Sequence, residues 1–251
     1  MHRNIKVASW QDLRTVLEEH RGWAFRGQSQ ADWPLYCTLS RYFISFGLHK
    51  DALPLQEERI LRIFKRKAHL LLTHIPSDDN PLEWLALMQH HGAPTRLLDF
   101  TWSPYVAAFF ALQRATKNAA IWAIFPPRLE RPIDSFLTAH YEDDFLPNTK
   151  KILAIGEPTR MNQRMVAQAG TFVIPGILHE PAELLAPSEA IVKIVLQADK
   201  MRRKAMEELY NMNITNATLF PGLGGLARSL AYELEYHWKF DPITMDRKKG
   251  F

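Results

Sequence analysis

A helix that is apolar on nearly every side constrains the fold most strongly. The run SPYVAAFFALQRA, residues 103–115, begins with a serine that can cap a helix and a proline suited to the first helical position. The residues that follow are almost all apolar, so we expect this helix to be buried all round. The next run, AAIWAIF at residues 119–125, is typical of a buried strand. A chain of 251 residues, 47% of them hydrophobic, is long enough to supply the core that both elements need.

Helical and strand-like patterns follow one another without regular strand–helix–strand spacing, which favours an α+β fold. We expect one domain over residues 1–251, with a core of about residues 8–240 and a central, mostly antiparallel or mixed sheet flanked by helices. Between residues 126 and 160, five prolines predict loops with one short helix around residues 133–141. Caps, stops and periodicity predict helices at residues 9–22, 55–74, 80–92, 103–115, 199–212 and 221–238, and strands at residues 23–25, 95–103, 119–125, 170–175 and 190–197.

The cysteine content and the apolar runs predict the compartment. Cys37 is the one cysteine and cannot form an internal disulfide, so a reducing environment is expected, and its neighbours suggest a small buried side chain. The N-terminus lacks the apolar segment of a signal peptide, and no apolar run approaches the ~20 residues of a membrane span. We therefore expect a cytoplasmic protein without membrane contact.

A basic stretch at residues 59–67 lies within the predicted helix 55–74. It fills the side of the helix opposite the apolar residues, so one interpretation is the solvated face of an amphipathic helix. The other interpretation is a surface that meets nucleic acid. The net charge of +4 and the isoelectric point of about 9.1 permit attraction to phosphate-rich partners without requiring it.

Polar groups are densest in QHHGAPTRLLDFTWSPYVAAFFA, residues 89–111. If residues 97–103 are extended, Asp99, Thr101 and Ser103 project from one face at the period of a strand. A carboxylate aligned with two hydroxyls at the edge of a buried element needs partners, and we expect them from Arg96, from His90 or from the Arg26 that follows the strand WAF. Polar groups gathered between two apolar helices favour a ligand pocket.

Structural roles for the same residues stay open. His90 at a helix C-terminus gains from the helix dipole, and Ser103 is a good N-cap. Asp99 and Arg96 would also suit a buried ion pair. For Ser103 we favour capping over chemistry. The cluster as a whole favours a site.

Three common kinds of site are absent from the sequence. The HH pair places adjacent histidines on different faces of a helix, and neither HExxH nor CxxC occurs, so we expect no metal site. The run PGLGG at residues 221–225 lacks the lysine of a phosphate-binding loop, so we interpret it as a turn. The GxSxG pattern of a nucleophilic serine does not occur.

A further polar stripe lies in RMNQRMVAQAGTFVIPG, residues 160–176. Arg160, Arg164 and Gln168 recur every four residues, which on a helix places them along one face. One interpretation is a surface stripe. The other is that Gln168, next to the strand that enters the core, points into a pocket.

Together these motifs resemble the FRG-domain family, named for Phe25, Arg26 and Gly27. The run at residues 89–111 resembles the family's central motif, RMVAQAGTFVI its later Arg, Gln and Gly-x-Phe segment, and LFPGLGGLARSL its terminal signature. The resemblance runs in order from about residue 8 to residue 235. Proteins of this family occur widely in bacteria and their mobile elements, so it implies a toxin or phage-defence context.

The motif order also resembles that of ADP-ribosyltransferases, which implies their fold and NAD as co-substrate. In that resemblance Arg26 grips phosphate or ribose, and Thr101, Ser103 and Gln168 hold the base or ribose. His90 and Arg96 polarise the pocket, and Asp99 assists the developing charge. The same resemblance assigns ligand binding to further residues, namely Phe25, Gly27, Gln28 and Arg164.

The chain departs from the transferases in having no glutamate near Gln168, and Glu157, Glu233 and Glu235 do not match its position. Either Asp99 serves instead or the site is not catalytic. A non-enzymatic nucleotide or nucleic-acid sensor therefore stays open. A nuclease or other hydrolase built on His90, Arg96 and Asp99 also stays open, although it lacks the carboxylate cluster that metal-dependent hydrolysis favours.

Overall fold

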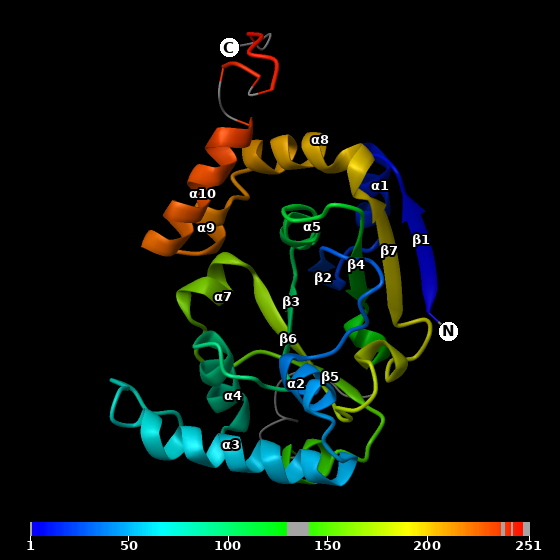
Figure 1. Ribbon diagram of the computed structural model, residues 1–251. Coiled ribbons are helices and arrows are strands. Elements are labelled where there is room, and N and C mark those ends of the chain that lie inside the picture. Colours follow the sequence, from blue (N-terminus) through cyan, green and yellow to red (C-terminus); the bar gives the residue numbers. More distant parts are fainter. Residues whose placement is uncertain (1, 130–140, 237–238, 242, 248–251) are drawn as a thin grey trace.

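The computed structural model describes residues 2–129, 141–236, 239–241 and 243–247. These residues form an α+β fold around one seven-stranded sheet, with the strand order β1-β7-β4-β2-β3-β6-β5 (Figure 1). Its strands are β1 (Arg3–Val7), β2 (Ala24–Gln28), β3 (Leu98–Thr101), β4 (Asn118–Ile124), β5 (Leu153–Gly156), β6 (Gly170–Pro175) and β7 (Ile191–Gln197). Strand β1 pairs with β7 in parallel and the other pairs are antiparallel, which confirms the predicted mixed, mostly antiparallel sheet.

The longer helices are α1 (Trp10–Glu19), α2 (Thr38–Phe46), α3 (Leu53–Ala68), α4 (Pro81–His90), α5 (Pro104–Leu112), α8 (Ala198–Asn211) and α10 (Leu223–Tyr236), and the short ones are α7 (Gln163–Ala167) and α9 (Asn216–Leu219). The predicted caps are confirmed: the side chains of Ser9, Asn80 and Ser103 each accept a hydrogen bond from the backbone N–H three residues later. Helix α3 ends at Ala68, six residues before the predicted end.

Strands β1 and β5 and helices α2 and α9 are among the elements that were not predicted. Strand β1 buries only Val7, so its sequence lacks the apolar alternation of a strand. Strand β5 corrects the expectation of loops up to residue 160, because its four buried residues pair with β6 although prolines flank them. Helix α2 is capped by Cys37, whose sulfur accepts a hydrogen bond from the N–H of Ser40, and burial raises the pKa of the Cys37 thiol. The short helix expected around residues 133–141 lies almost wholly outside the described residues.

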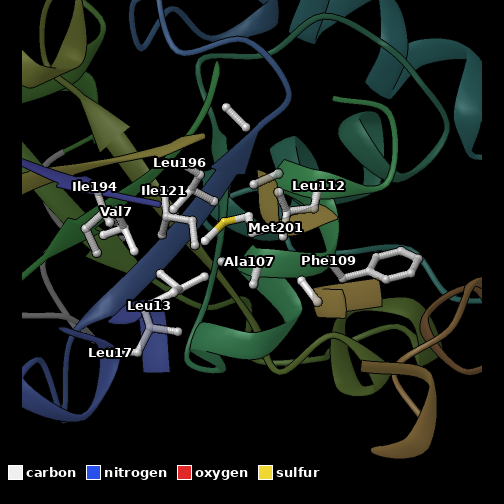
Figure 2. Packing of buried hydrophobic residues seen from close by; sticks show 14 of the residues in the cluster. Val7, Leu13, Leu17, Ala107, Phe109, Leu112, Ile121, Ile194, Leu196 and Met201 are labelled. Atoms are coloured by element: carbon white, nitrogen blue, oxygen red, sulfur yellow. The ribbon is translucent and has the colours of Figure 1, made fainter. Parts of the chain in front are cut away.

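The buried apolar helix α5 lies in the main core, as predicted. It packs with α1 and α8 against strands β1, β4 and β7, and Figure 2 shows these side chains together. A second cluster covers the other face of the sheet, and a third joins α4 to β5 and β6. Within the described residues, no helix combines the length and the apolar character needed to cross a membrane.

Strand β2 does not end before Arg26, as the run WAF suggested, but continues to Gln28. Gly27 lies within it because α5 crosses directly above. A Cβ at Gly27 would lie 2.1 Å from the carbonyl oxygen of Ala107 and 2.5 Å from the amide nitrogen of Ala111. The glycine is therefore required for close packing of helix on strand rather than to end the strand.

Candidate functional site

The sheet opens between β2 and β3. These two strands pair only at Phe25 and Thr101, whereas β2 pairs with β4 along its whole length and β3 pairs with β6 from Leu98 to Thr101. Strands that diverge leave backbone groups without ladder partners, so another group has to satisfy them. The opening brings side chains and backbone of two central strands to one place.

Arg26 spans this opening. Its Nη1 donates a hydrogen bond of 2.7 Å to the backbone oxygen of Asp99, the residue of β3 that ladder pairing leaves free on this side. Its Nε is buried and has no hydrogen-bond partner among the described residues. Burial lowers the pKa of Arg26 and the Asp99 carboxylate opposes that effect. The guanidinium thus remains a cation with an unused donor, which favours an anionic ligand.

A cavity of about 580 Å³ lies at the opening. It brings together three arginines, one carboxylate and several aromatic rings. The described lining residues are Phe25, Arg26, Gly27, Gln28, Ser29, Trp33, Pro34, Tyr36, Arg41, Asp99, Phe100, Thr101, Phe110, Arg164 and Gln168. Most of the residues predicted to bind a ligand, from three separate stretches of sequence, therefore meet in one cavity. We call it the sheet cavity.

Asp99 is the one carboxylate among the described residues of the sheet cavity. Its Oδ1 accepts a hydrogen bond of 2.9 Å from Nε2 of Gln89, and the oxygen of Gln89 in turn accepts from the hydroxyl of Thr95. These bonds hold the carboxylate at the mouth of the cavity, where it stays exposed. Gln89 begins the central motif, but the sequence analysis did not predict that it would hold Asp99. An amide side chain can pair with many polar groups, so the sequence does not indicate which one it contacts.

Arg96 does not line the sheet cavity and does not pair with Asp99. It is fully buried, with Nε 2.6 Å from a carboxylate oxygen of Glu57 and Nη1 donating at 3.0 Å to the carbonyl oxygen of Pro175. The hydroxyl of Tyr141 donates to Glu57 at 3.1 Å, and burial followed by the charge of Glu57 raises the pKa of Tyr141. Arg96 therefore joins α3 to the end of β6, because Glu57 is the buried charge that packing brings to it.

The side chains of Thr101 and Ser103 form hydrogen bonds with backbone groups. The buried hydroxyl of Thr101 donates to the carbonyl oxygen of Gln168 at 2.6 Å and accepts from the N–H of Ser103 at 3.0 Å. Strand β3 ends at Thr101, so Ser103 leaves the predicted row of side chains and caps α5 instead. Thr101 lines the cavity, and Ser103 is outside its lining.

Gln168 and Arg164 reach the sheet cavity from α7, whereas Arg160 does not join them. The helix starts only after its cap at Asn162, so the four-residue stripe is broken before it begins. Nε2 of Gln168 donates to the carbonyl oxygen of Leu219 at 2.9 Å. The guanidinium of Arg164 lies 4.9 Å from the ring centre of Phe220. Leu219 and Phe220 thus hold the side chains of Gln168 and Arg164 in place.

His90 lies beside the sheet cavity rather than in it. It lines a small hollow of about 60 Å³ that also includes Asp99, Arg164 and Gln168. Burial lowers the pKa of His90, and the neighbouring His91 and Arg164 lower it further. The neutral imidazole is therefore the favoured form at neutral pH.

The loop after β2 and the helix α2 that follows it supply cavity residues that the sequence reasoning missed: Trp33 and Tyr36 from the loop, and Arg41 from α2. Gln28 fixes this loop: its Oε1 accepts from the indole N–H of Trp122 at 2.8 Å, and its Nε2 donates to the carbonyl oxygen of Pro34. The sequence feature that could have indicated these cavity residues is the pair of aromatic residues in WPLY, which follows FRGQ closely.

Other charged groups lie away from the sheet cavity. Glu157 accepts from the indole of Trp102 at 2.6 Å, and Glu233 accepts from the hydroxyl of Tyr210. On α3, the basic stretch includes the ion pairs of Arg62 with Glu58 and of Lys65 with Asp78. Nucleic-acid binding by residues 59–67 stays a prediction. In the described part of the chain, no three His, Cys, Asp or Glu side chains are placed to share a metal ion.

Comparison with known proteins gives one match. The family model described as the FRG domain matches residues 21–120, which run from the start of β2 through the central motif and into β4. No curated protein and no solved structure matches the chain. The resemblance of the stretches after residue 120 stays a prediction.

Proposed function

Residues 21–120 of this chain belong to the FRG domain family, and from that premise we propose that the protein is an ADP-ribosyltransferase-like enzyme that binds NAD in the sheet cavity. One observation carries the proposal. An early, a middle and a late strand, β2, β3 and β6, are neighbours in the sheet. Arg26 on β2, Thr101 on β3 and Gln168, at the end of α7 just before β6, line one cavity, which is the arrangement that the resemblance to ADP-ribosyltransferases implies.

The cavity suits a dinucleotide. NAD carries two phosphates between two nucleosides, so it needs cations near its middle and flat apolar surfaces near its ends. Arg26 offers an unused buried donor, and Arg41 and Arg164 add two more cations. Rings of Trp33 and Phe110 provide surfaces on which a base can stack. A volume of about 580 Å³ is typical of small-molecule sites.

Asp99 is the residue placed to assist the reaction. Bound NAD would supply the ADP-ribosyl group, and loss of nicotinamide builds positive charge on the ribose. The carboxylate of Asp99, held by Gln89, stabilises that charge more in the transition state than in the ground state. Arg26 fixes the backbone of Asp99 through its bond to the carbonyl oxygen, so binding and charge stabilisation depend on one contact.

The test is nicotinamide release from NAD by the full chain, alone and with RNA, DNA or cell lysate as acceptor. We expect Asp99→Asn to lower turnover by about 10²-fold or more, since it removes a preorganised charge, while NAD affinity changes little. Arg26→Ala should weaken NAD binding, measured by calorimetry. Arg21→Gln, at an exposed position that is not among the lining residues of the sheet cavity, is the matched control and should behave as wild type. Turnover that survives both cavity substitutions, or the absence of turnover and NAD binding in wild type, contradicts the proposal.

A further inference from the structure

Another cavity, of about 300 Å³, lies among the residues that follow the end of α5 and helices α8, α9 and α10. The end of α5 contributes Gln113 and Arg114, and α8 and α10 face it. The complete set of described lining residues is Gln113, Arg114, Arg202, Met206, Asn216, Arg228, Ala231 and Tyr232. None of them lines the sheet cavity, so an inference about this helix cavity stands apart from the proposed function.

Three arginines from three elements converge on the helix cavity, and none of its described lining residues is acidic. Arg202 is held in place: its Nε donates to the carbonyl oxygen of Leu112 at 3.0 Å and its Nη2 to that of Gln113 at 3.1 Å. Arg114 and Arg228 are exposed and form no ion pair with any described residue. Like charges that converge repel one another, so an anion between them would offset that repulsion.

The walls of the helix cavity are fixed. The rings of Tyr210 on α8 and Tyr232 on α10 stack with centres 4.8 Å apart and planes 1° apart. The hydroxyl of Tyr232 also donates to the carbonyl oxygen of Met206. Arg228 lies over the ring of Phe220, 5.2 Å from its centre. The relative position of α8 and α10 is thus set before any ligand arrives, which lowers the entropic cost of binding.

We propose that the helix cavity binds a small phosphomonoester. A doubly charged phosphate group matches the two unpaired guanidinium groups, whose planar donors bind phosphate oxygens in pairs. The amides of Gln113 and Asn216 can bind hydroxyl groups, and the ring of Tyr232 can contact the organic part. At about 300 Å³ the cavity is roughly half the size of the sheet cavity, which favours a mononucleotide or sugar phosphate over a dinucleotide.

The test is calorimetric titration of the full chain with AMP, ribose 5-phosphate, inorganic phosphate and adenosine. We expect AMP and ribose 5-phosphate to bind and adenosine not to bind. Arg114→Gln and Arg228→Gln should each weaken binding about 10-fold or more, since each removes hydrogen bonds to a charged group. Arg202 is left unchanged, because its loss would free the carbonyl groups at the end of α5. Arg21→Gln, at an exposed position among the lining residues of neither cavity, is the matched control, and Arg26→Ala reports on the sheet cavity.

The outcomes separate the two cavities. Weaker binding in Arg114→Gln and Arg228→Gln, with binding retained in Arg26→Ala, supports the proposal. A preference for AMP over ribose 5-phosphate would identify the ligand as a nucleotide, and equal affinities would identify a sugar phosphate. Binding that is lost only in Arg26→Ala places the phosphate in the sheet cavity and overturns the proposal. The absence of binding by every phosphate compound at millimolar concentration also overturns it.

Discussion

The sheet cavity and the helix cavity both gather three arginines, but they hold them in different ways. In the sheet cavity, Arg26 lies between two diverging strands and is tied to the backbone oxygen of Asp99 at 2.7 Å. In the helix cavity, Arg114 and Arg228 stand exposed at helix ends and surfaces. The first cavity therefore depends on backbone geometry, and the second depends on side chains carried by packed helices.

This difference sets how each cavity responds to its surroundings. The guanidinium of Arg26 is partly buried, so it interacts with a ligand at a lower effective dielectric constant than the exposed guanidinium groups of Arg114 and Arg228, which are screened by salt. Binding to the helix cavity should thus weaken more steeply with ionic strength than binding to the sheet cavity. The contrast shows that two cavities with the same number of arginines can differ in how strongly ligand binding depends on salt.

The largest expected effect concerns the backbone of the sheet cavity. In Gly27→Ala the new Cβ meets the backbone of α5, so we expect a loss of about 3 kcal/mol in the free energy of unfolding. In Gly224→Ala on α10 the Cβ has no atom within 4 Å, and the variant should gain up to about 1 kcal/mol because alanine favours a helix. Urea denaturation measures both. A Gly27→Ala variant as stable as wild type would show that helix and strand are not in close contact here.

A smaller effect is expected at the ring that connects the two cavities. The ring centre of Phe220 lies 4.9 Å from the guanidinium of Arg164, which lines the sheet cavity, and 5.2 Å from the guanidinium of Arg228, which lines the helix cavity. Phe220→Leu removes a cation–π contact worth about 0.5–1 kcal/mol from each arginine, so the dissociation constants for NAD and for AMP should each rise about two- to five-fold. Calorimetry measures both constants. Phe46→Leu, at an exposed ring on α2, is the control. A change in only one constant would show that the ring serves one cavity.

The smallest effect separates the cavities by pH. The pKa of His90 is lowered by burial, His91 and Arg164, and Asp99 lies in the same small hollow, whereas none of the described residues that line the helix cavity is a histidine. The usual pKa of a histidine is about 6.5, so between about pH 6.5 and the lowered pKa of His90 the unfolded chain binds the proton more readily than the folded chain does. The folded state therefore loses stability as the pH falls through this window.

The variant His90→Gln removes the titrating group, so comparing it with wild type isolates the contribution of the His90 proton to stability. Unfolding free energies of wild type and His90→Gln, measured by urea denaturation from pH 7 to pH 5, should diverge, with wild type losing more as the pH falls. The difference should be small, because His90 is largely solvated. Parallel curves for the two proteins would contradict the assignment.

The amino-acid sequence by itself determined the local parts of this molecule. The caps at Ser9, Asn80 and Ser103, the buried helix α5 and five of the strands follow from patterns a few residues long, whose physical causes act within one turn or one strand. The sequence also predicts that the FRG tripeptide and the central motif share a site, and residues 21–120 match the family that these motifs resemble.

Only the tertiary structure decided which of those residues meet. Arg26 contacts Asp99 across 73 positions of sequence, and Arg96 pairs with Glu57 across 39 positions. A charged side chain shows that a partner is needed, but the choice among several carboxylates depends on how distant elements pack. The opening between β2 and β3 and the two arginine-lined cavities have the same origin, because the pairing of strands and helices far apart in the chain is a property of the whole fold.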